Sequence, residues 1–213
     1  MTKTSASIST RRARATVADH PDRLTAAEAV ARVRRDDREI VTFIGYSGAG
    51  YEDEAAMIAA VREELSRHEP REVVVNAGAT AEGIGAVYRI AKELGFATSG
   101  IVSSRALESE SALSESLDRL AVVEDDTWGG FLPGTDQLSP TSRAMVEASD
   151  RFVAIGGGKV GRDELIVARQ AGKPIRFVPA DMNHEAARKA ARKEGREAPT
   201  DFRGPVHEMM CTP

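Results

Sequence analysis

Three segments of the chain place glycines and hydroxyl side chains between an apolar run and an amphipathic run. Glycine lets the backbone come close to a ligand, and a helix that begins at such a turn offers unpaired N–H groups and a partial positive charge. These features suit an anion, most naturally a phosphate, and three such junctions favour a phosphorylated ligand over tight turns alone. The candidate ligand-binding residues are Gly45, Ser47, Gly48 and Gly50 in the first segment, Gly78, Thr80 and Gly83 in the second, and Gly156, Gly157, Gly158, Lys159, Gly161 and Arg162 in the third.

The spacing within these segments disfavours several familiar phosphate sites. The first segment reads G-x-x-G-x-G instead of the dinucleotide-binding G-x-G-x-x-G, and Asn76 stands where a dehydrogenase carries the acid that holds a ribose. The second has the glycine spacing of a P-loop, but Ile84 and Gly85 replace its Lys-Ser/Thr pair. A nicotinamide-dependent oxidoreductase, a kinase and an ATPase are therefore disfavoured. Ser47 is expected to donate to a phosphate, because Ala49 breaks the G-x-S-x-G elbow of a nucleophilic serine.

Charged side chains follow the glycines of the third segment. Lys159 and Arg162 are expected to neutralise a phosphate or pyrophosphate, although both also fit an exposed loop tip. Glu164 is suited to stabilise the positive charge that builds on a sugar when an N-glycosidic bond breaks. The alternative is that Asp163 and Glu164 lie in the first turn of a helix and complement its dipole, which is worth about 0.3–1 kcal/mol for each acid. Both interpretations stay open.

The segment EDDTWGGFLPG carries Trp128, the one tryptophan of the chain. A loop with glycine, proline and a single aromatic residue could close over a ring by stacking. The other interpretation, which we favour, is that Trp128 is buried at the edge of a sheet and anchors the loop. Asp125 and Asp126 are candidate contacts to ribose hydroxyls.

The histidines do not follow a metal-ligand spacing, so no metal site is predicted, and no cofactor is expected besides the ligand. They are His20, His68, His184 and His207. Asp181 and Asn183 precede the last charged helix of the pattern. Either residue caps that helix, or the segment contacts the ligand.

Strand-like and helix-like segments alternate along the chain. The predicted strands cover residues 39–46, 71–78, 96–102, 120–125, 151–157 and 175–180. The predicted helices cover residues 25–37, 53–67, 82–95, 112–120, 139–150, 162–174 and 183–195. This order predicts an α/β fold with a Rossmann-like, doubly wound, mostly parallel sheet of about six strands and helices on both faces. Ligands of such sheets bind outside the carboxyl ends of the strands, where the glycine segments lie.

Composition limits the class of protein. The 213 residues are 41% hydrophobic and 29% charged, which indicates a soluble globular chain. The net charge of −4, and the lack of an apolar run of about 20 residues, argue against a nucleic-acid or membrane partner. One cysteine, Cys211, fits a reducing compartment, so a cytoplasmic location is expected.

The chain is expected to form one domain with two tails. The segment before Asp19 is rich in Ser, Thr and Arg, as a transit peptide is, but it shows no amphipathic apolar stripe. We therefore favour a disordered basic tail. The predicted division is a tail over residues 1–24, a single domain over residues 25–198 and a C-terminal tail over residues 199–213.

The segment ASDRFVAIGGGKVGRDELIVARQAGKP, with GYSGAG and NAGATAEGIGAVYRIAKELG before it, resembles the SLOG superfamily. That superfamily includes the lonely-guy phosphoribohydrolases, often labelled lysine decarboxylase-like, with the signature ADxxIALPGGxGTxxE. The resemblance covers roughly residues 40–179 and implies a Rossmann-like fold that binds a nucleotide or its derivative. It implies that Glu164 and Arg143 are the catalytic residues that release the base from a nucleoside 5′-monophosphate, and that the protein is a homodimer.

The chain also departs from the signature of those enzymes. Val160 and Gly161 stand in place of the signature's Gly-Thr. Retention of Glu164 favours the N-glycosidase. The departures favour a non-catalytic protein that binds a nucleotide, a cofactor or an ADP-ribose-like ligand. On the sequence, the N-glycosidase is the leading hypothesis and the non-catalytic binding protein is a close second.

Overall fold

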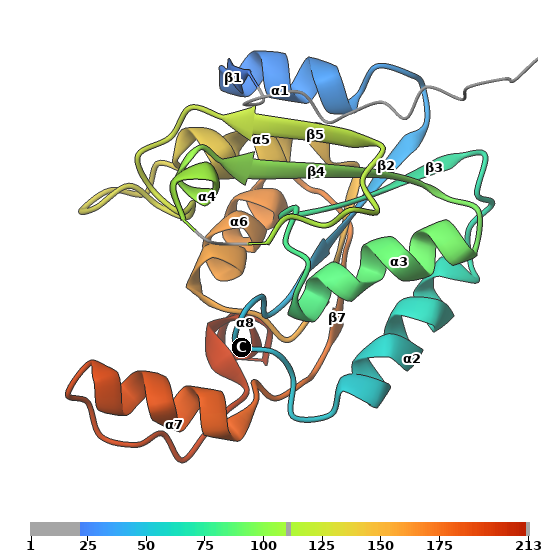
Figure 1. The fold of residues 1–213 in the computed structure, drawn as a ribbon. Helices are drawn as coiled ribbons and strands as arrows, with labels where there is room; N and C mark the ends of the chain where they lie inside the picture. The colour runs from blue at the N-terminus through green and yellow to red at the C-terminus, as the bar shows by residue number, and fades with distance from the viewer. Residues whose placement is uncertain (1–21, 110–111, 212–213) are drawn as a thin grey trace, which may run out of the picture.

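Seven parallel strands form the single sheet of the described chain, which comprises residues 22–109 and 112–211 of the computed structural model (Figure 1). The strands are β1 (Arg23–Leu24), β2 (Glu39–Ile44), β3 (Val73–Ala77), β4 (Ala97–Ser103), β5 (Arg119–Val123), β6 (Arg151–Ile155) and β7 (Ile175–Val178). Their order across the sheet is β1-β5-β4-β3-β2-β6-β7, and every neighbouring pair is parallel.

Helices connect the strands and cover both faces of the sheet. They are α1 (Ala26–Val33), α2 (Glu54–Leu65), the 3₁₀ helix η1 (Gly83–Gly85), α3 (Ala86–Glu93), α4 (Arg105–Glu108), α5 (Pro140–Ala148), α6 (Lys159–Gln170), α7 (His184–Lys193) and α8 (Gly204–Cys211). Within the described residues, none of these helices is long and apolar enough to cross a membrane.

Alternation along β2 explains why helices pack on both faces. Val41 and Phe43 pack against α2 and α3, whereas Ile40 and Ile44 pack on the opposite face against α1, α5, α6 and α8 (Figure 1). Successive side chains of a strand point to opposite faces, so a strand buried on both faces reads as a continuous apolar run. The α/β class and the helices on both faces are therefore as predicted.

The chain changes its direction across the sheet between β2 and β6. From β2 it adds β3, β4 and β5 on one side, and it then crosses to add β6 and β7 on the other side. The connections that follow β2 and β6 consequently leave toward opposite faces. In an open α/β sheet, this divergence creates a crevice at the carboxyl ends of the two strands.

The sheet has seven strands instead of the predicted six, because Arg23 and Leu24 pair with β5 at the edge. Two residues are too short a segment to show a hydrophobic pattern, which is why the sequence placed them in a tail. Residues 204–211, assigned to the other tail, form α8, and Val206 of this helix is fully buried. The structure thus contains a strand before the predicted start of the domain at residue 25 and a helix after its predicted end at residue 198. Residues 1–21 lie outside the described residues.

The predicted helix over residues 112–120 is wrong. Leu113 forms an isolated bridge with Thr80, and the N–H of Ser114 donates to the carbonyl of Ala79 at 2.9 Å. The backbone of this segment therefore bonds to the loop that follows β3 and not to itself. The short helix of this region is α4, which lies before the segment.

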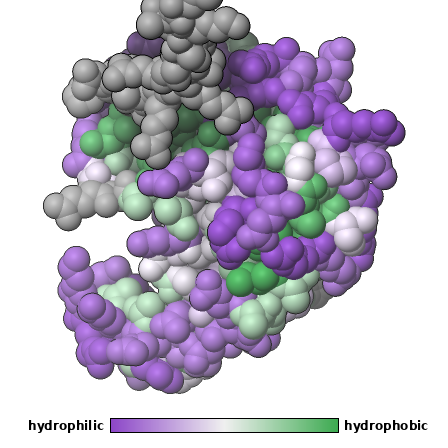
Figure 2. Space-filling model, turned by 45° about the vertical axis from the view of Figure 1, so that its right-hand side comes forward, coloured by the Kyte–Doolittle hydropathy of each residue, from purple (hydrophilic) through white to green (hydrophobic). Residues whose placement is uncertain are grey.

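The surface gives little support to the predicted homodimer, which stays a prediction. Figure 2 shows a face on which hydrophilic side chains predominate and hydrophobic ones form separate patches. Leu94 and Trp128 are the large hydrophobic side chains exposed in the described part of the chain. The apolar face of α6 is covered by α8 in this chain.

We predict that α8 contributes to the stability of the domain. Val206→Ala is expected to lower the free energy of unfolding by about 2 kcal/mol, because it removes two buried carbon atoms and leaves a cavity against Ile44 and Gly157. Urea denaturation measures the change, and Lys189→Ala on the exposed surface of α7 serves as the control. Equal stability of V206A and the wild-type protein would show that α8 does not pack on the domain.

Candidate functional site

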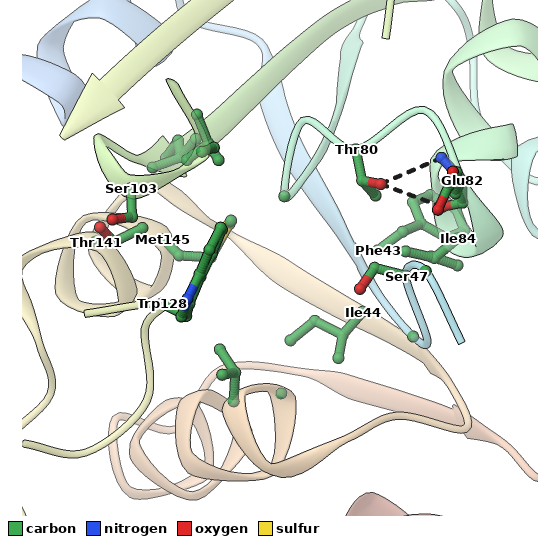
Figure 3. A pocket seen from close by; sticks show the side chains of 18 of the residues that line it. Phe43, Ile44, Ser47, Thr80, Glu82, Ile84, Ser103, Trp128, Thr141 and Met145 are labelled. Carbon is green, nitrogen blue, oxygen red and sulfur yellow. Dashed lines mark hydrogen bonds between the residues drawn. The ribbon is translucent and has the colours of Figure 1, made fainter. Parts of the chain in front are cut away.

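A cavity of about 710 Å³ opens at the carboxyl ends of β2, β3 and β4, next to the point where the chain changes direction (Figure 3). Cavities that hold small molecules have volumes of about 300–1,000 Å³. Large apolar side chains form much of its lining, namely Phe43, Ile44, Ile84, Ile101 and Met145. Its polar side chains are Ser47, Thr80, Glu82, Ser103, Thr141 and Glu164.

Two walls of different character face each other across the cavity. Figure 3 shows Trp128 on the same side as Ser103 and Thr141, whereas Ser47 and Thr80 lie on the opposite side. The side chain of Trp128 is 52% exposed, so its favoured interpretation as a buried anchor is wrong. A half-exposed indole at a cavity wall can stack on a planar ring.

The cavity brings together residues of all three glycine segments. Seven of the predicted site residues line it: Gly45, Ser47, Gly48, Gly78, Thr80, Gly161 and Glu164. The remaining predicted residues do not line it: Gly50, Gly83, Gly156, Gly157, Gly158, Lys159, Arg162 and Arg143. The first two segments therefore contribute their loops, and the third contributes mainly the first turns of α6.

Two glycines of the third segment serve close packing. A Cβ atom at Gly156 would lie 2.5 Å from the ring of Tyr46, and one at Gly157 would lie 2.8 Å from a methyl group of Val206. Both glycines are buried and have positive φ angles, of 56° and 134°. Because these two glycines have no side chain, α8 and Tyr46 can pack onto the turn. The geometry therefore gives no support to the prediction that Gly156 and Gly157 contact a ligand.

The cationic side chains of the third segment do not line the cavity. The guanidinium of Arg162 pairs with Asp163, with Nη2 and Oδ1 2.6 Å apart, and Lys159 is exposed. Arg143 is exposed on α5, so we do not retain it as a catalytic residue. In the described part of the chain, no lysine or arginine lines the cavity.

Glu164 is a buried carboxyl group in the wall of the cavity. It is 5% exposed, and its Oε1 accepts a hydrogen bond from the Ser142 hydroxyl at 2.6 Å. Burial raises its pKa to about 7, against the opposing effect of the Ser142 hydrogen bond, and the neighbouring Asp163 raises the pKa further. A carboxyl group that titrates near neutral pH in a cleft is a feature of functional sites, although structural networks also produce it.

Neither of the aspartates that are candidate ribose contacts lines the cavity. Asp125 is buried and accepts hydrogen bonds from the N–H groups of Thr127 and Thr141, at 2.8 and 2.9 Å. Its two carboxylate oxygens thus fix the start of the loop and the first turn of α5. Asp126 does not line the cavity.

Tyrosine hydroxyls, which the sequence reasoning missed, hold the loops in place. The hydroxyl of Tyr51 accepts from the N–H of Tyr46 at 3.2 Å and donates to the carbonyl of Ile155 at 2.9 Å, so it ties the end of β2 to the end of β6. The hydroxyl of Tyr88 accepts from the N–H of Ala79 at 3.0 Å. Ala79 has a φ of 59°, a conformation that costs energy for a residue with a side chain and that this bond helps to hold.

Glu82 is a lining residue that sequence reasoning also missed. It belongs to the second glycine segment, and a Cβ atom at Gly48 would lie 3.2 Å from its Oε2 atom. Its carboxylate has no protein partner in the described part of the chain. The sequence pattern that could have identified Glu82 was its position between the glycines of the second segment. A free carboxylate here disfavours an anion beside Gly48.

The segment after β7 forms a helix cap. The side chain of Asn183 accepts from the N–H of Ala186 at 3.0 Å, so it is the N-cap of α7, one of the two interpretations left open. A second cavity, of about 340 Å³, is lined by residues that include Glu52 and Asp181. Across residues 22–109 and 112–211, no cluster of histidine, cysteine and acidic residues could hold a metal ion.

Comparisons with known proteins give a likeness to solved structures. No protein-family model and no curated protein matches the chain. The molybdenum cofactor carrier protein from Chlamydomonas reinhardtii is 19% identical over 74% of this chain and 86% of that chain, with a TM-score of 0.47. The molybdenum cofactor binding protein from Rippkaea orientalis is 14% identical over 76% of this chain and 87% of that chain, with a TM-score of 0.48. Because these sequence identities and TM-scores are low, the likeness does not identify a ligand, which has to be inferred from the cavity. Membership of the SLOG superfamily stays a prediction.

We predict that Glu164 makes stability depend on pH. Because its pKa is raised to about 7 in the folded protein, it stabilises the fold when protonated, and this contribution is lost as the pH rises through 7. Between pH 5 and pH 8, the free energy of unfolding of the wild-type protein is expected to fall by roughly 1–3 kcal/mol relative to that of Glu164→Gln. Urea denaturation of both proteins at the two pH values measures the difference.

The exposed Glu69 offers a matched control for this experiment. Glu69→Gln is expected to follow the wild-type protein at both pH values. If the stability of E164Q runs parallel to that of the wild-type protein between pH 5 and pH 8, the carboxyl group of Glu164 does not titrate in this range.

Proposed function

We propose that this protein binds a phosphorylated, nucleotide-derived small molecule in the cavity, without catalysing a reaction on it. The observation that carries the proposal is the pairing of two features in one cavity of about 710 Å³. Trp128 supplies a half-exposed aromatic ring, with the guanidinium carbon of Arg105 5.9 Å from its centroid, and Val160 and Gly161 bring the N-terminus of α6 into the lining. An aromatic face suits a base, and a helix N-terminus suits a phosphate.

The phosphate is assigned to the end of the cavity at α6. The N–H groups of the first helical turn have no partner within the helix, and the dipole of the helix favours a negative charge there. At the other end, the free carboxylate of Glu82 repels a phosphate. That end also carries the hydroxyls of Ser47 and Thr80, so it suits the hydrogen-bonding groups of a sugar or ring.

The absence of cationic side chains from the described lining supports binding over catalysis. Breaking a glycosidic bond of a nucleoside monophosphate requires a carboxylate and close control of the phosphate. Arg143, the expected second catalytic residue, is exposed outside the cavity. Val160 also lines the cavity at a position where the phosphoribohydrolase signature has glycine.

Hydrolysis of an N-glycosidic bond is a second candidate function, and one observation favours it. Glu164 lines the cavity, and its pKa is raised to about 7. A carboxyl group with such a pKa can stabilise an oxocarbenium-like sugar and direct a water molecule. Of the two predicted catalytic residues, Glu164 and Arg143, this function would use only Glu164.

We predict that nucleoside 5′-monophosphates bind and that Trp128 contributes to their affinity. Trp128→Ala is expected to weaken binding by about 10- to 100-fold, because stacking on a base is worth about 1–3 kcal/mol. Stability should change little, because the ring is half exposed. Isothermal titration calorimetry against a panel of monophosphates measures the affinities, and Leu94→Ala, at the other exposed hydrophobic side chain, is the control.

The same samples separate binding from hydrolysis. Chromatography of each mixture is expected to recover the intact nucleotide. Release of free base by the wild-type protein, lost in Glu164→Gln, would establish the second candidate function. If no monophosphate binds, or if W128A binds as tightly as the wild-type protein, the proposed site is wrong.

A further inference from the structure

The loop over residues 124–139, which we call the Trp128 loop, joins β5 to α5 and carries the indole to the cavity. The loop folds back on itself, since Phe131 bridges Leu138 and the N–H of Leu132 donates to the carbonyl of Gln137 at 2.8 Å. The start of the loop is held by the hydroxyls of Ser103 and Ser104, which donate to the carbonyls of Thr127 and Asp125 at 2.6 and 3.1 Å. Beyond Trp128, buried polar groups of α5 and α6 hold it, and one of them is Glu164, which the sequence suggested for catalysis.

Ser142 connects the loop to Glu164. The hydroxyl of Ser142 accepts a hydrogen bond from the N–H of Gly130 at 2.7 Å and donates to Oε1 of Glu164 at 2.6 Å. Ser142 is fully buried and Glu164 is 5% exposed, so water does not compete for these bonds. The carboxyl group thereby fixes, through one hydroxyl, a backbone group two residues beyond Trp128.

Asp163 holds the next residue of the loop. Its Oδ2 accepts from the N–H of Phe131 at 3.0 Å, while its Oδ1 pairs with Arg162. Asp163 is fully buried. Consecutive acids of α6 therefore hold consecutive N–H groups of the loop, at Gly130 and Phe131.

The fit between the loop and α6 requires glycine at two positions. A Cβ atom at Gly129 would lie 2.9 Å from the hydroxyl oxygen of Ser142, and one at Gly130 would lie 2.9 Å from Oδ2 of Asp163. Both glycines have positive φ angles, of 104° and 83°. The loop can approach these acceptors only because neither residue has a side chain.

Complementing the helix dipole does not account for the two acids. α6 begins at Lys159, so Asp163 and Glu164 are its fifth and sixth residues and lie beyond the first turn. The dipole effect falls off within that turn. Burying two adjacent carboxyl groups is costly, and hydrogen bonds to the loop offset that cost.

We propose that Ser142, Asp163 and Glu164 are positioning residues that hold the Trp128 loop against α6 and so keep the indole in the cavity wall. This inference rests on the proposed function only where it predicts a change in the affinity for the ligand. The placement of the loop itself does not depend on any ligand. Glu164 then acts on the ligand through the loop and needs no contact with a reacting atom.

Trp128 reports on its own position, because it is the only tryptophan of the chain. Ser142→Ala removes the hydroxyl that links Gly130 to Glu164, so the loop is expected to loosen. Quenching of tryptophan fluorescence by acrylamide should then rise by up to about twofold, since the side chain is already 52% exposed. Affinity for the monophosphate should fall by about two- to tenfold, because the indole must be ordered on binding.

Matched variants distinguish positioning from general destabilisation. Ser149→Ala removes a fully buried serine at the opposite, C-terminal end of α5 that does not touch the loop, so it should lower stability without changing the quenching. Glu164→Gln keeps an oxygen that accepts from Ser142 and should keep the quenching of the wild-type protein. Glu164→Leu removes that acceptor and should raise the quenching as Ser142→Ala does.

The outcomes separate this inference from the proposed function. If no monophosphate binds but quenching rises in S142A and E164L only, the positioning role stands and the proposed ligand is wrong. If quenching in S142A equals that of the wild-type protein, or if S149A raises it equally, the positioning role is overturned.

Discussion

The divergence of two neighbouring connections is the constraint on which the site depends. β2 and β6 are adjacent and parallel, yet the chain leaves β2 toward the face covered by α2 and leaves β6 toward the face covered by α6. The cavity lies beside this divergence, at the ends of β2, β3 and β4 and at the start of α6. The Tyr51 hydroxyl, which belongs to the connection after β2, ties the end of β2 to the end of β6.

The cavity presents backbone N–H groups and an aromatic face where many phosphate sites present cationic side chains. Arg162 is neutralised by Asp163, and the buried acids of α6 are engaged with the Trp128 loop. Helix α6 therefore has two roles. Its first turn lines the cavity, and Asp163 and Glu164 in its second turn hold the Trp128 loop. Movement of α6 would change both ligand-binding features together.

The sequence predicts the sheet well and the site only in part. Six strands and the helices between them, except the wrongly predicted helix over residues 112–120, follow from apolar periodicity, whereas β1 is too short to show any. The loops after β2 and β3 were correctly placed beside one another, because parallel strands end at one edge. The role of Gly157 depends on Val206, about fifty residues away, and that of Gly156 depends on the ring of Tyr46, which no local pattern reveals. The exposure of Trp128 and the bonds of Glu164 likewise depend on tertiary contacts across three elements.

A crystal structure of the protein with a bound nucleoside 5′-monophosphate tests the central claim most directly. The account predicts phosphate oxygens within hydrogen-bond distance, about 2.7–3.2 Å, of the backbone nitrogens in the first turn of α6, with the base stacked on Trp128. A phosphate bound at another place, or a first turn of α6 that is closed by the protein's own side chains, would contradict it.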